Sequence, residues 1–567
     1  MKEKSDNRGN LDSLLNLKKY KQYALDVVEG RQIACKYVIQ ACERYLSWFE
    51  NRPDLIFRAD KAEAVIAFIS KLKHYSGRFN RKPFILLPYQ KWMIYSIFGW
   101  YYKNDPEKRV TKKIYIELAR KQGKTAFMSA ISLYCLLETP AAECYNISNN
   151  AKQAKICFDM SSNFLSSIDP KGKFFERYRD SIRFNATKSK IQVLSNNSSG
   201  NDGYSPSFFV LDEAHEQPDS KGWDVMISGQ GARYNDNCLA AIITTAGFNK
   251  FLFCYEYRAT CTEILANLKT DDSQFIAIYT QDEDDDIFND EECWIKSTPS
   301  LGVTVSKEYL REQVQNAQNN TSLLTGVLTK NFNLWCDSMD TWITHDGLLA
   351  CSESFELSKF NPDEDLCTVG VDLAAVSDLC AVSALVYKDD KYYFKTWYFL
   401  PESCLNPSNS NCELYRRWKR EGYLIATNGN VTDYDKILEL LGNFPLTISS
   451  IAYDQWNATS FVISGQSLFG LPFEPYSQSI FNFNRPTREF ERLLKSGKVV
   501  LDNNPITRWC FSNCVLKHEP SCDNVKPIKS GSGKSEKKSG QNKIDGVISI
   551  LQSLGRFLEN PILDTSI

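Results

Sequence analysis

An apolar segment at 208–211 ends in Asp212 and Glu213, and a Gly-Lys-Thr triplet occupies positions 123–125 earlier in the chain. Nucleotide phosphates are bound by backbone N–H groups at a helix N-terminus, a lysine for the outer phosphates and a hydroxyl that holds Mg²⁺. The triplet supplies all three. The first acid would hold Mg²⁺ through water, and the second would activate the attacking water. We therefore expect an ATP-hydrolysing site with Mg²⁺ at Thr125 and Asp212, formed by Gly123, Lys124, Thr125, Asp212 and Glu213.

Two further residues are candidates for this nucleotide site. The usual phosphate loop has glycine at the position of Leu118, so the triplet is a weak signal without its flanking strand and helix. A predicted strand at 239–244 is followed by Thr245, which could sense the γ-phosphate. Upstream, Gln90 could contact adenine, although a lone glutamine is more often structural.

Three aspartates in the last third of the chain form a second candidate site. Asp372 and Asp454 each follow three apolar or small residues, and Asp545 opens a predicted helix whose positive end suits an acid. Cleavage of a phosphodiester by two metal ions needs several carboxylates around ions about 4 Å apart, and oxygen ligands suit Mg²⁺ or Mn²⁺. The three aspartates therefore predict the catalytic and metal-binding residues of a nuclease, with Asp378 as a less certain fourth ligand.

Alternating strands and helices must position the first site. Residues 1–60 are expected to be helical, and residues 61–345 to form an α/β domain with a parallel sheet covered on both faces. Its apolar strand candidates are 113–118, 143–148, 208–211, 239–244 and 274–279. A polar, helix-prone stretch at 306–325 would pack at the end of this domain.

The second site needs a different sheet. Three successive strands at 368–373, 381–387 and 391–399, a helix at 412–421, a strand at 448–454 and a closing helix at 544–558 predict a ribonuclease H-like mixed sheet within residues 360–567. The lysine-rich run 526–543 before Asp545 is most simply a solvated loop, with backbone tracking of a nucleic acid as the alternative.

Bulk composition sets few further limits. A chain of 567 residues with 43% hydrophobic residues and a net charge of −2 is typical of a globular protein of two or three domains. No apolar run reaches the roughly 20 residues that span a bilayer. The polar start of the chain and the 18 cysteines, none spaced Cys-x-x-Cys, favour a reducing cytosol over secretion. Zinc at 510–522 is not favoured by the wide ligand spacing.

The motifs at 120–125, 211–215 and 244–247 resemble those of the large terminase subunits of tailed bacteriophages, and so does Lys-Ile-Asp-Gly at 543–546. The resemblance covers about residues 85–560. It implies a P-loop ATPase domain joined to a ribonuclease H-like nuclease domain. It also implies that Arg120 or Lys121 contacts phosphates in place of the usual glycine, and it makes Arg233 a candidate charge-stabilising arginine.

The same resemblance implies a viral DNA-packaging motor that uses ATP to move double-stranded DNA into a procapsid and cuts concatemeric DNA. ATP, Mg²⁺ and, at the nuclease site, Mg²⁺ or Mn²⁺ would be its cofactors. Its partners would be DNA, a portal protein, a small terminase subunit and other copies in a ring, in the cytoplasm of an infected bacterium and without a membrane. A helicase-like or defence ATPase fused to a metal-dependent nuclease, and a non-catalytic assembly protein, are the alternatives.

Overall fold

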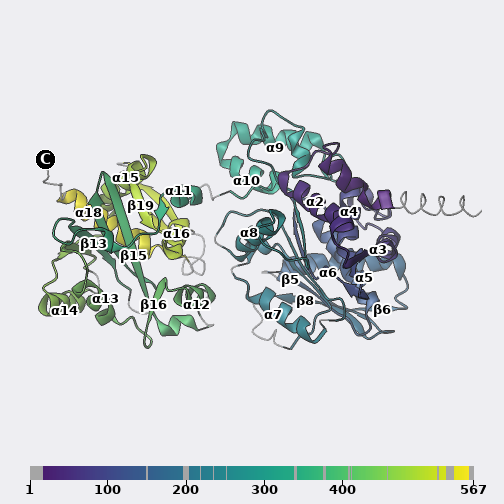
Figure 1. Ribbon diagram of the computed structural model, residues 1–567, viewed down its shortest axis with the longest axis horizontal. Coiled ribbons are helices and arrows are strands. Elements are labelled where there is room, and N and C mark those ends of the chain that lie inside the picture. Colours follow the sequence, from purple (N-terminus) through teal and green to yellow (C-terminus); the bar gives the residue numbers. More distant parts are fainter. Residues whose placement is uncertain are drawn as a thin grey trace, which may run out of the picture. The chain divides into compact units, whose positions relative to one another are not determined.

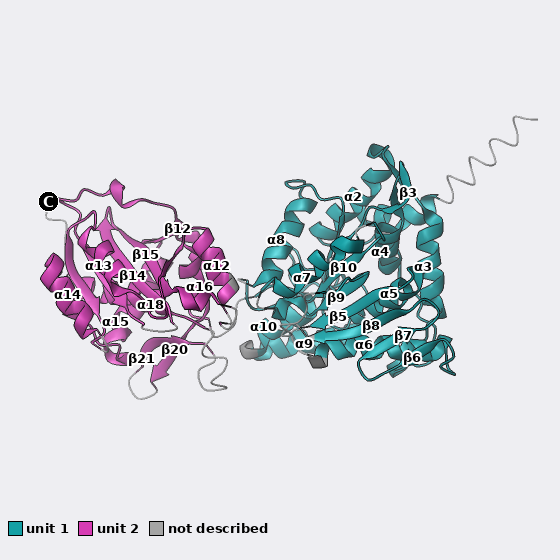
Figure 2. Cartoon of the chain, turned by 90° about the horizontal axis from the view of Figure 1, so that it is seen from below, with its two compact units in different colours: residues 1–336 teal, residues 337–567 magenta. Residues whose placement is uncertain are grey.

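The protein is described here by a computed structural model in two compact units, residues 1–336 and 337–567 (Figure 2). The structure describes residues 17–560 apart from 149–150, 196–202, 218, 234, 251, 337–340, 375–377, 407–408, 410, 456–457, 520–522 and 531–541. Among these residues, no helix is long and apolar enough to cross a membrane.

Unit 1 is built on an eight-stranded sheet with the order β11-β4-β10-β9-β5-β8-β7-β6. Neighbouring strands from β11 to β8 run parallel, and β7 and β6 add antiparallel pairs at one edge. The strands are β4 (Lys113–Glu117), β5 (Glu143–Ser148), β6 (Phe175–Arg177), β7 (Ser181–Phe184), β8 (Ser189–Ser195), β9 (Phe208–Asp212), β10 (Leu239–Thr244) and β11 (Gln274–Ile278). Every residue of β9 and β10 is buried, as expected for parallel strands covered on both faces.

Helices pack around this sheet (Figure 1). They are α2 (Lys36–Asn51), α3 (Ala59–Lys71), α4 (Pro88–Phe98), α5 (Lys124–Glu138), α6 (Ala151–Ile168), α7 (Lys221–Gly229) and α8 (Phe253–Leu265). A small antiparallel sheet accompanies them, made of β1 (Leu55–Phe57), β2 (Trp100–Tyr102) and β3 (Asp105–Arg109). The helices α9 (Lys307–Asn319) and α10 (Thr321–Phe332) form a separate small core with Trp294 and Phe332 at its centre.

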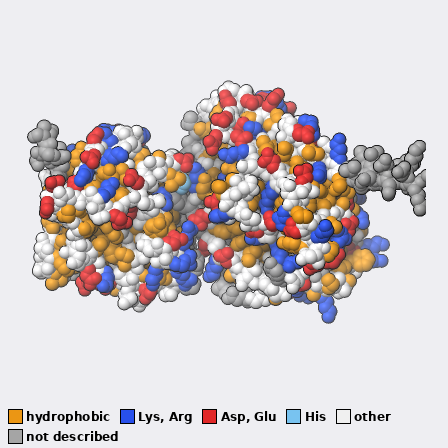
Figure 3. Space-filling model, in the orientation of Figure 1, with side chains coloured by type: hydrophobic (Ala, Val, Ile, Leu, Met, Phe, Trp, Pro, Cys, Tyr) orange, Lys and Arg blue, Asp and Glu red, His pale blue; other side chains and the backbone are white. Residues whose placement is uncertain are grey.

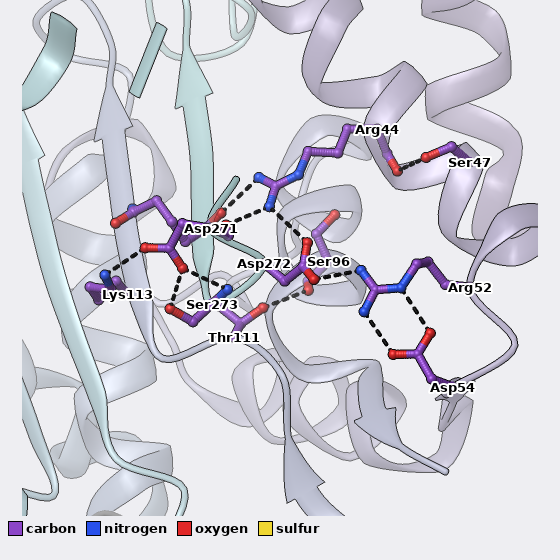
Figure 4. A network of polar contacts seen from close by, with 11 residues as sticks. Arg44, Ser47, Arg52, Asp54, Ser96, Thr111, Lys113, Asp271, Asp272 and Ser273 are labelled. Carbon is purple, nitrogen blue, oxygen red and sulfur yellow. Dashed lines mark hydrogen bonds and ion pairs between the residues drawn. The ribbon is translucent and has the colours of Figure 1, made fainter. Parts of the chain in front are cut away.

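Charged contacts fix the N-terminal helix α2 to the main sheet (Figure 4). Arg44 donates to the carbonyl oxygens of Gln274 at 2.9 Å and Asp271 at 2.7 Å. Arg52 pairs with Asp272 at 2.5 Å, and Lys113 of β4 pairs with the Asp271 carboxylate at 2.7 Å. Apolar residues of α2 also belong to the main core of unit 1. The N-terminal helices are therefore part of the same compact unit as the parallel sheet.

Unit 2 contains a mixed sheet with the order β12-β19-β15-β14-β13-β17-β18, and β16 pairs with β15. The pairs β13–β14 and β14–β15 are antiparallel, whereas β13–β17, β17–β18, β15–β16, β15–β19 and β12–β19 are parallel. The strands are β12 (Ser352–Glu353), β13 (Cys367–Asp372), β14 (Cys380–Lys388), β15 (Lys391–Pro401), β16 (Leu424–Thr427), β17 (Ile448–Tyr453), β18 (Phe473–Pro475) and β19 (Val499–Asp502). A separate hairpin is made of β20 (Cys514–Glu519) and β21 (Asn524–Lys529).

Alternation along β13 shows how helices cover this sheet on both faces. Val369 and Val371 belong to a core with residues of α13 (Tyr434–Gly442) and α14 (Thr459–Phe469). On the opposite face, a Cβ added at Gly370 would lie 2.0 Å from the carbonyl oxygen of Ser549, so α18 (Asp545–Glu559) approaches the strand backbone closely. The remaining helices of the unit are α11 (His345–Ala350), α12 (Cys412–Arg420), α15 (Ile480–Lys495) and α16 (Pro505–Ser512).

The predicted fold class is confirmed, including the parallel sheet of unit 1 and the mixed sheet of unit 2. Short strands such as β1, β6 and β18 were not predicted, because three residues are too few to show a period. The prediction of a loop for 526–543 was wrong at its start, because Lys526 and Lys529 lie in β21. Most of the rest of that run lies outside the described residues.

Candidate functional sites

The loop between β4 and α5 has the backbone expected of a phosphate loop. Gly123 is the N-cap of α5 and has φ of 80°, a left-handed conformation that suits glycine. Lys121 is also left-handed, with φ of 64°. The turn thus brings the chain from the end of a parallel strand directly to a helix N-terminus, where anions bind.

Lys124 fills the inside of this loop. Its amine is buried and donates hydrogen bonds to the carbonyl oxygens of Leu118 at 2.6 Å and Ala119 at 2.9 Å. Burial lowers the pKa of Lys124 to about 8, against the opposing effect of the charges of Glu213 and Asp212. The lysine is therefore held at the centre of the loop, close to both predicted acids.

Asp212 ends β9 and faces the first turn of α5. The hydroxyl of Thr125 lies 3.4 Å from its Oδ2, the arrangement in which a hydroxyl and a carboxylate can share a metal ion. Burial and the neighbouring charge of Glu213 raise the pKa of Asp212 to about 7, although Lys124 opposes the shift. A divalent cation would offset the charge repulsion, so the donor set fits a metal ion.

His215 connects the second acid to the end of β10. Its Nδ1 lies 3.3 Å from Oε2 of Glu213, 3.1 Å from the Thr244 hydroxyl and 3.5 Å from the Thr245 hydroxyl. Burial lowers the pKa of His215 to about 4, so the imidazole is neutral at pH 7. Glu213 itself has φ of 51°, which turns the chain sharply after β9. The His215 ring therefore contacts the acidic motif that ends at Glu213 and the hydroxyl motif of Thr244 and Thr245.

A further contact joins the phosphate loop to the segment before α9. The side-chain oxygen of Gln122 accepts hydrogen bonds from the backbone N–H of Ser300 at 3.0 Å and from its hydroxyl at 2.5 Å. The hydroxyl of Tyr89 donates to the Gln122 carbonyl oxygen at 3.0 Å. Gln122 thus ties the loop to a segment about 180 residues away in sequence.

The register of unit 2 brings the predicted nuclease residues to one edge of the sheet. Val371 pairs with Tyr453 on the parallel strands β13 and β17, so the next residues, Asp372 and Asp454, leave adjacent strands at the same edge. Such strands are about 4.8 Å apart. Asp372, Asp378 and Asp545 line a cavity of about 410 Å³ at this edge.

The acids of this cavity repel one another. Burial and then the charge of Asp545 raise the pKa of Asp372 well above its ordinary value, with a smaller contribution from Asp454. Burial also raises the pKa of Asp545, and its Oδ2 is buried without a hydrogen-bond partner. An all-carboxylate set of this kind fits Mg²⁺ or Mn²⁺. As the side chains stand, however, no three His, Cys, Asp or Glu of the described chain are grouped closely enough to hold one ion.

Asp378 has different neighbours from the other three aspartates. It forms an ion pair with Lys543 and lies 3.4 Å from the amine of Lys529, and both lysines are close to the same cavity. Burial lowers the pKa of Lys543. In this arrangement two lysine amines already contact the Asp378 carboxylate.

Family models match both halves of the chain. The model of the terminase large subunit endonuclease domain matches residues 268–561, more than half of the chain, and that of the ATPase domain matches residues 88–263. The chain belongs to the terminase large subunit family. It is accordingly an ATPase and an endonuclease, and its activities use a nucleotide and divalent metal. The endonuclease match begins within unit 1, so it includes the small α9–α10 core.

The chain is also similar to individual proteins. Protein YmfN of Escherichia coli (strain K12) is 30% identical over 373 residues, which cover 63% of this chain and 78% of that protein. The terminase large subunit of Lactococcus phage SK1 is 22% identical and covers 88% of this chain and 92% of its own length. The crystal structure of the HK97 bacteriophage large terminase is 23% identical, covers 88% of this chain and 99% of its own, and has a TM-score of 0.49.

Three residues predicted for the nucleotide site of this terminase lie at its rim. Arg120 and Lys121 are exposed on the phosphate loop, and the backbone N–H of Arg120 donates to the carbonyl of Lys330 at 2.9 Å. Gln90 lies beside Gly123, but its oxygen already accepts the backbone N–H of Leu87 at 3.0 Å and so helps to cap α4. Only its amide N–H groups are left to contact a base.

The structure does not bring Arg233 to the phosphate loop of the same chain. Its guanidinium donates to the carbonyl oxygen of Ala141 at 2.9 Å, just before β5 begins. The phosphate loop follows the carboxyl end of β4, and the intervening strands are all parallel. Arg233 therefore lies at the opposite edge of the sheet from Lys124. A role for it in the nucleotide site would require a second copy of the chain.

Three residues that contact these sites were not predicted from the sequence, namely His215, Gln122 and Gln478. Gln478 donates its side-chain amide to Oδ1 of Asp372 at 3.0 Å and lines the same cavity. His215 and Gln122 lie inside recognised motifs, which was the available signal. Gln478 follows a three-residue strand and has no neighbouring pattern, so only the pairing of β18 with β17 places it.

Proposed function

We propose that unit 1 binds ATP with Lys124, Thr125 and the backbone of Gly123, and hydrolyses it with Glu213. Support comes from the buried amine inside the loop and from the 3.4 Å approach of Thr125 to Asp212. Mg²⁺ held by Thr125 and Asp212 would neutralise charge on the outer phosphates. Arg120 and Lys121 would contact phosphates from the rim, Gln90 the base, and Thr245, through His215, would respond to the state of the γ-phosphate.

In unit 2, Asp372, Asp454 and Asp545 are proposed to hold Mg²⁺, or Mn²⁺, and to cut DNA. Divalent ions in such a site supply an activated water and stabilise the leaving oxygen. The aspartates would be the ligands, and Gln478 would orient Asp372. We assign Asp378 to lysine positioning, because Lys543 and Lys529 already surround its carboxylate.

The whole chain is proposed to act as a viral DNA-packaging motor that moves double-stranded DNA into a procapsid and cuts concatemers. The observation that carries this proposal is that a terminase large subunit has one candidate site in each of its two compact units. Partners would be DNA, a portal protein, a small terminase subunit and further copies in a ring, in the cytoplasm of an infected bacterium. A ring would also allow Arg233 to reach a neighbouring chain's nucleotide.

Two pairs of substitutions, one pair for each site, test the assignment of the sites. With plasmid DNA and Mn²⁺ or Mg²⁺, we expect cleavage by the wild type and none by Asp454→Ala or Asp545→Asn, both of which should retain ATP turnover. Lys124→Ala and Glu213→Gln should show the reverse pattern. Equal loss of both activities in a folded variant would contradict two independent sites. Cleavage that survives in both aspartate variants would remove the proposed nuclease site.

A further inference from the structure

Helix α12 of unit 2 separates aromatic and basic residues onto two faces. Cys412, Tyr415 and Trp418 are buried, whereas Arg416 and Lys419 are exposed. Arg420 is also exposed and lies on the same face, because positions 416, 419 and 420 are three and four residues apart. Lys and Arg side chains gather over this helix on the surface (Figure 3).

The buried face fixes α12 to the part of the unit that carries Asp545. The rings of Trp418 and Tyr415 lie 5.3 Å and 6.4 Å from that of Trp509 in α16. Helix α16 packs against α18, which begins at Asp545. The charge of Asp545 is also among the causes that raise the pKa of Tyr415. The exposed basic residues of α12 are therefore linked, through α16, to the helix that begins at the predicted catalytic residue Asp545.

Strand register places the beginning of this region at the edge that holds the acids. Asp372 pairs with Ala381, and Ala381 pairs with Tyr398. Strand β15 ends three residues after Tyr398, at Pro401, and a short 3₁₀ turn at Glu402–Leu405 follows. Two strand spacings amount to about 10 Å. Tyr398 thus lies about this far across the sheet from Asp372, and the turn begins four residues further along β15, a rise of about 13 Å.

A hollow of about 560 Å³ lies between this turn and α12. It is lined by Glu402, Leu405, Asn406, Arg416, Lys419 and Arg420. The amine of Lys419 lies 2.9 Å from Glu402, the one acid of the lining. Outside the hollow, Arg417 pairs with Glu421 at 2.9 Å. Three of the lining side chains are therefore basic and one is acidic.

We propose that Arg416, Lys419 and Arg420 bind the phosphate backbone of duplex DNA next to the position of cleavage. The proposal rests on the nuclease function assigned to unit 2. Duplex DNA carries one negative charge per about 1.7 Å of its axis, so a duplex cut at Asp372 and Asp545 presents phosphates at the distance of α12. Arginine and lysine on one helix face suit such contacts and carry no sequence preference.

The test is equilibrium binding of the full-length protein to a blunt 30-base-pair duplex, with EDTA present so that no cutting occurs. We expect the triple variant Arg416→Ala, Lys419→Ala, Arg420→Ala to bind about tenfold or more weakly at moderate salt. Each lost phosphate contact should reduce the slope of log affinity against log salt by about 0.9. A second triple variant, Arg416→Lys, Lys419→Arg, Arg420→Lys, keeps the charges and should bind like the wild type, which would show that charge is the cause.

A matched control removes three positive charges from the opposite edge of the same sheet. Arg492, Lys495 and Lys498 lie just before or beside the start of β19, which pairs with the beginning of β15. Each is paired with an acid, as Lys419 is: Glu489, Glu491 and Asp390. Alanine at these three positions should leave both the affinity and its salt slope unchanged.

The outcomes separate this surface from the nuclease assignment. If the α12 variant keeps wild-type affinity and slope while the wild type cuts DNA, the surface proposal is wrong and the nuclease stands. The same holds if the α12 and control variants weaken binding equally. A wild type that neither binds nor cuts duplex DNA would overturn both proposals. If the α12 variant binds DNA normally but no longer associates with an acidic partner protein, the surface binds that protein and the DNA proposal is wrong.

Discussion

The amine of Lys124 donates a hydrogen bond to the carbonyl oxygen of Leu118 at 2.6 Å, inside its own phosphate loop. Together with the bond to Ala119, this contact replaces the hydrogen bonds to water that the ammonium loses when it is buried. A bound phosphate would compete for the same amine. The lysine that the nucleotide needs is therefore also the residue that ties this loop to the end of β4.

Removing that amine should abolish tight nucleotide binding. We expect Lys124→Met, which keeps most of the side-chain length, to weaken ATP binding about 10- to 100-fold, since a charged hydrogen bond contributes about 1.5–3 kcal/mol. Titration with a fluorescent ATP analogue measures the effect. Lys91→Met, on the exposed side of α4, is the control and should bind normally. Unchanged affinity in Lys124→Met would place the phosphates elsewhere.

Asp212 should make the nucleotide-free protein less stable as the pH rises. Its pKa of about 7 in the folded state exceeds the ordinary value of 3.8, so between pH 4 and 7 the folded state binds more protons than the unfolded state. Stability contributed by this group is present at low pH and is lost as the pH rises through about 7. We expect Asp212→Asn to have a free energy of unfolding about 1–4 kcal/mol higher than that of the wild type at pH 8 in EDTA, and so to unfold at a higher temperature. This difference should disappear near pH 4.

His215 should affect the rate of ATP hydrolysis more than ATP affinity. Its ring contacts Glu213, the acid proposed to hydrolyse ATP, and the Thr244 hydroxyl at the end of β10. We expect His215→Ala to lower kcat for ATP at least tenfold with a Kd for ATP within about threefold of the wild type. Because its pKa is about 4, no change in rate between pH 6 and 9 should come from this ring. A large loss of affinity for ATP with a normal kcat would contradict a role of His215 in positioning Glu213.

Gln478 should tune metal affinity at the nuclease site. A hydrogen bond that orients a carboxylate ligand typically changes metal affinity by 10- to 100-fold when it is lost. We expect Gln478→Leu to bind Mn²⁺ about tenfold more weakly, measured by electron paramagnetic resonance of free Mn²⁺ without DNA. Gln466→Leu, exposed on α14, supplies the control. Equal Mn²⁺ affinity in the two variants would show that Asp372 needs no such orientation.

Gly370 should be intolerant of any side chain. A methyl group there would meet the Ser549 carbonyl at 2.0 Å and the Ser553 nitrogen at 2.6 Å, both in the backbone of α18. We expect Gly370→Ala to lower stability by about 1–3 kcal/mol, measured by thermal unfolding, and to reduce DNA cleavage while ATP turnover continues. Gly326→Ala in α10, with nothing within 4 Å, should be neutral or stabilising.

The sequence by itself determined the elements whose signals are local. Continuous apolar runs such as 208–211 and 239–244 are typical of buried parallel strands, and the acids and hydroxyls that end such strands then meet at one edge of the sheet. The same reasoning made Lys124, Asp212, Asp372 and Asp545 candidate site residues. Family membership followed from the same motifs, because they combine a residue type with a fixed spacing.

Only the tertiary structure decided which distant residues serve these sites. Ser300 reaches Gln122, Gln478 reaches Asp372, and Arg233 lies away from the loop, and none of these outcomes leaves a periodic trace in the sequence. The physical reason is that side-chain contacts over 100 or more positions depend on strand order and register. Strand order and register are fixed by the packing of the whole sheet. A single amide hydrogen bond contributes too little free energy to require a recognisable pattern in the neighbouring sequence.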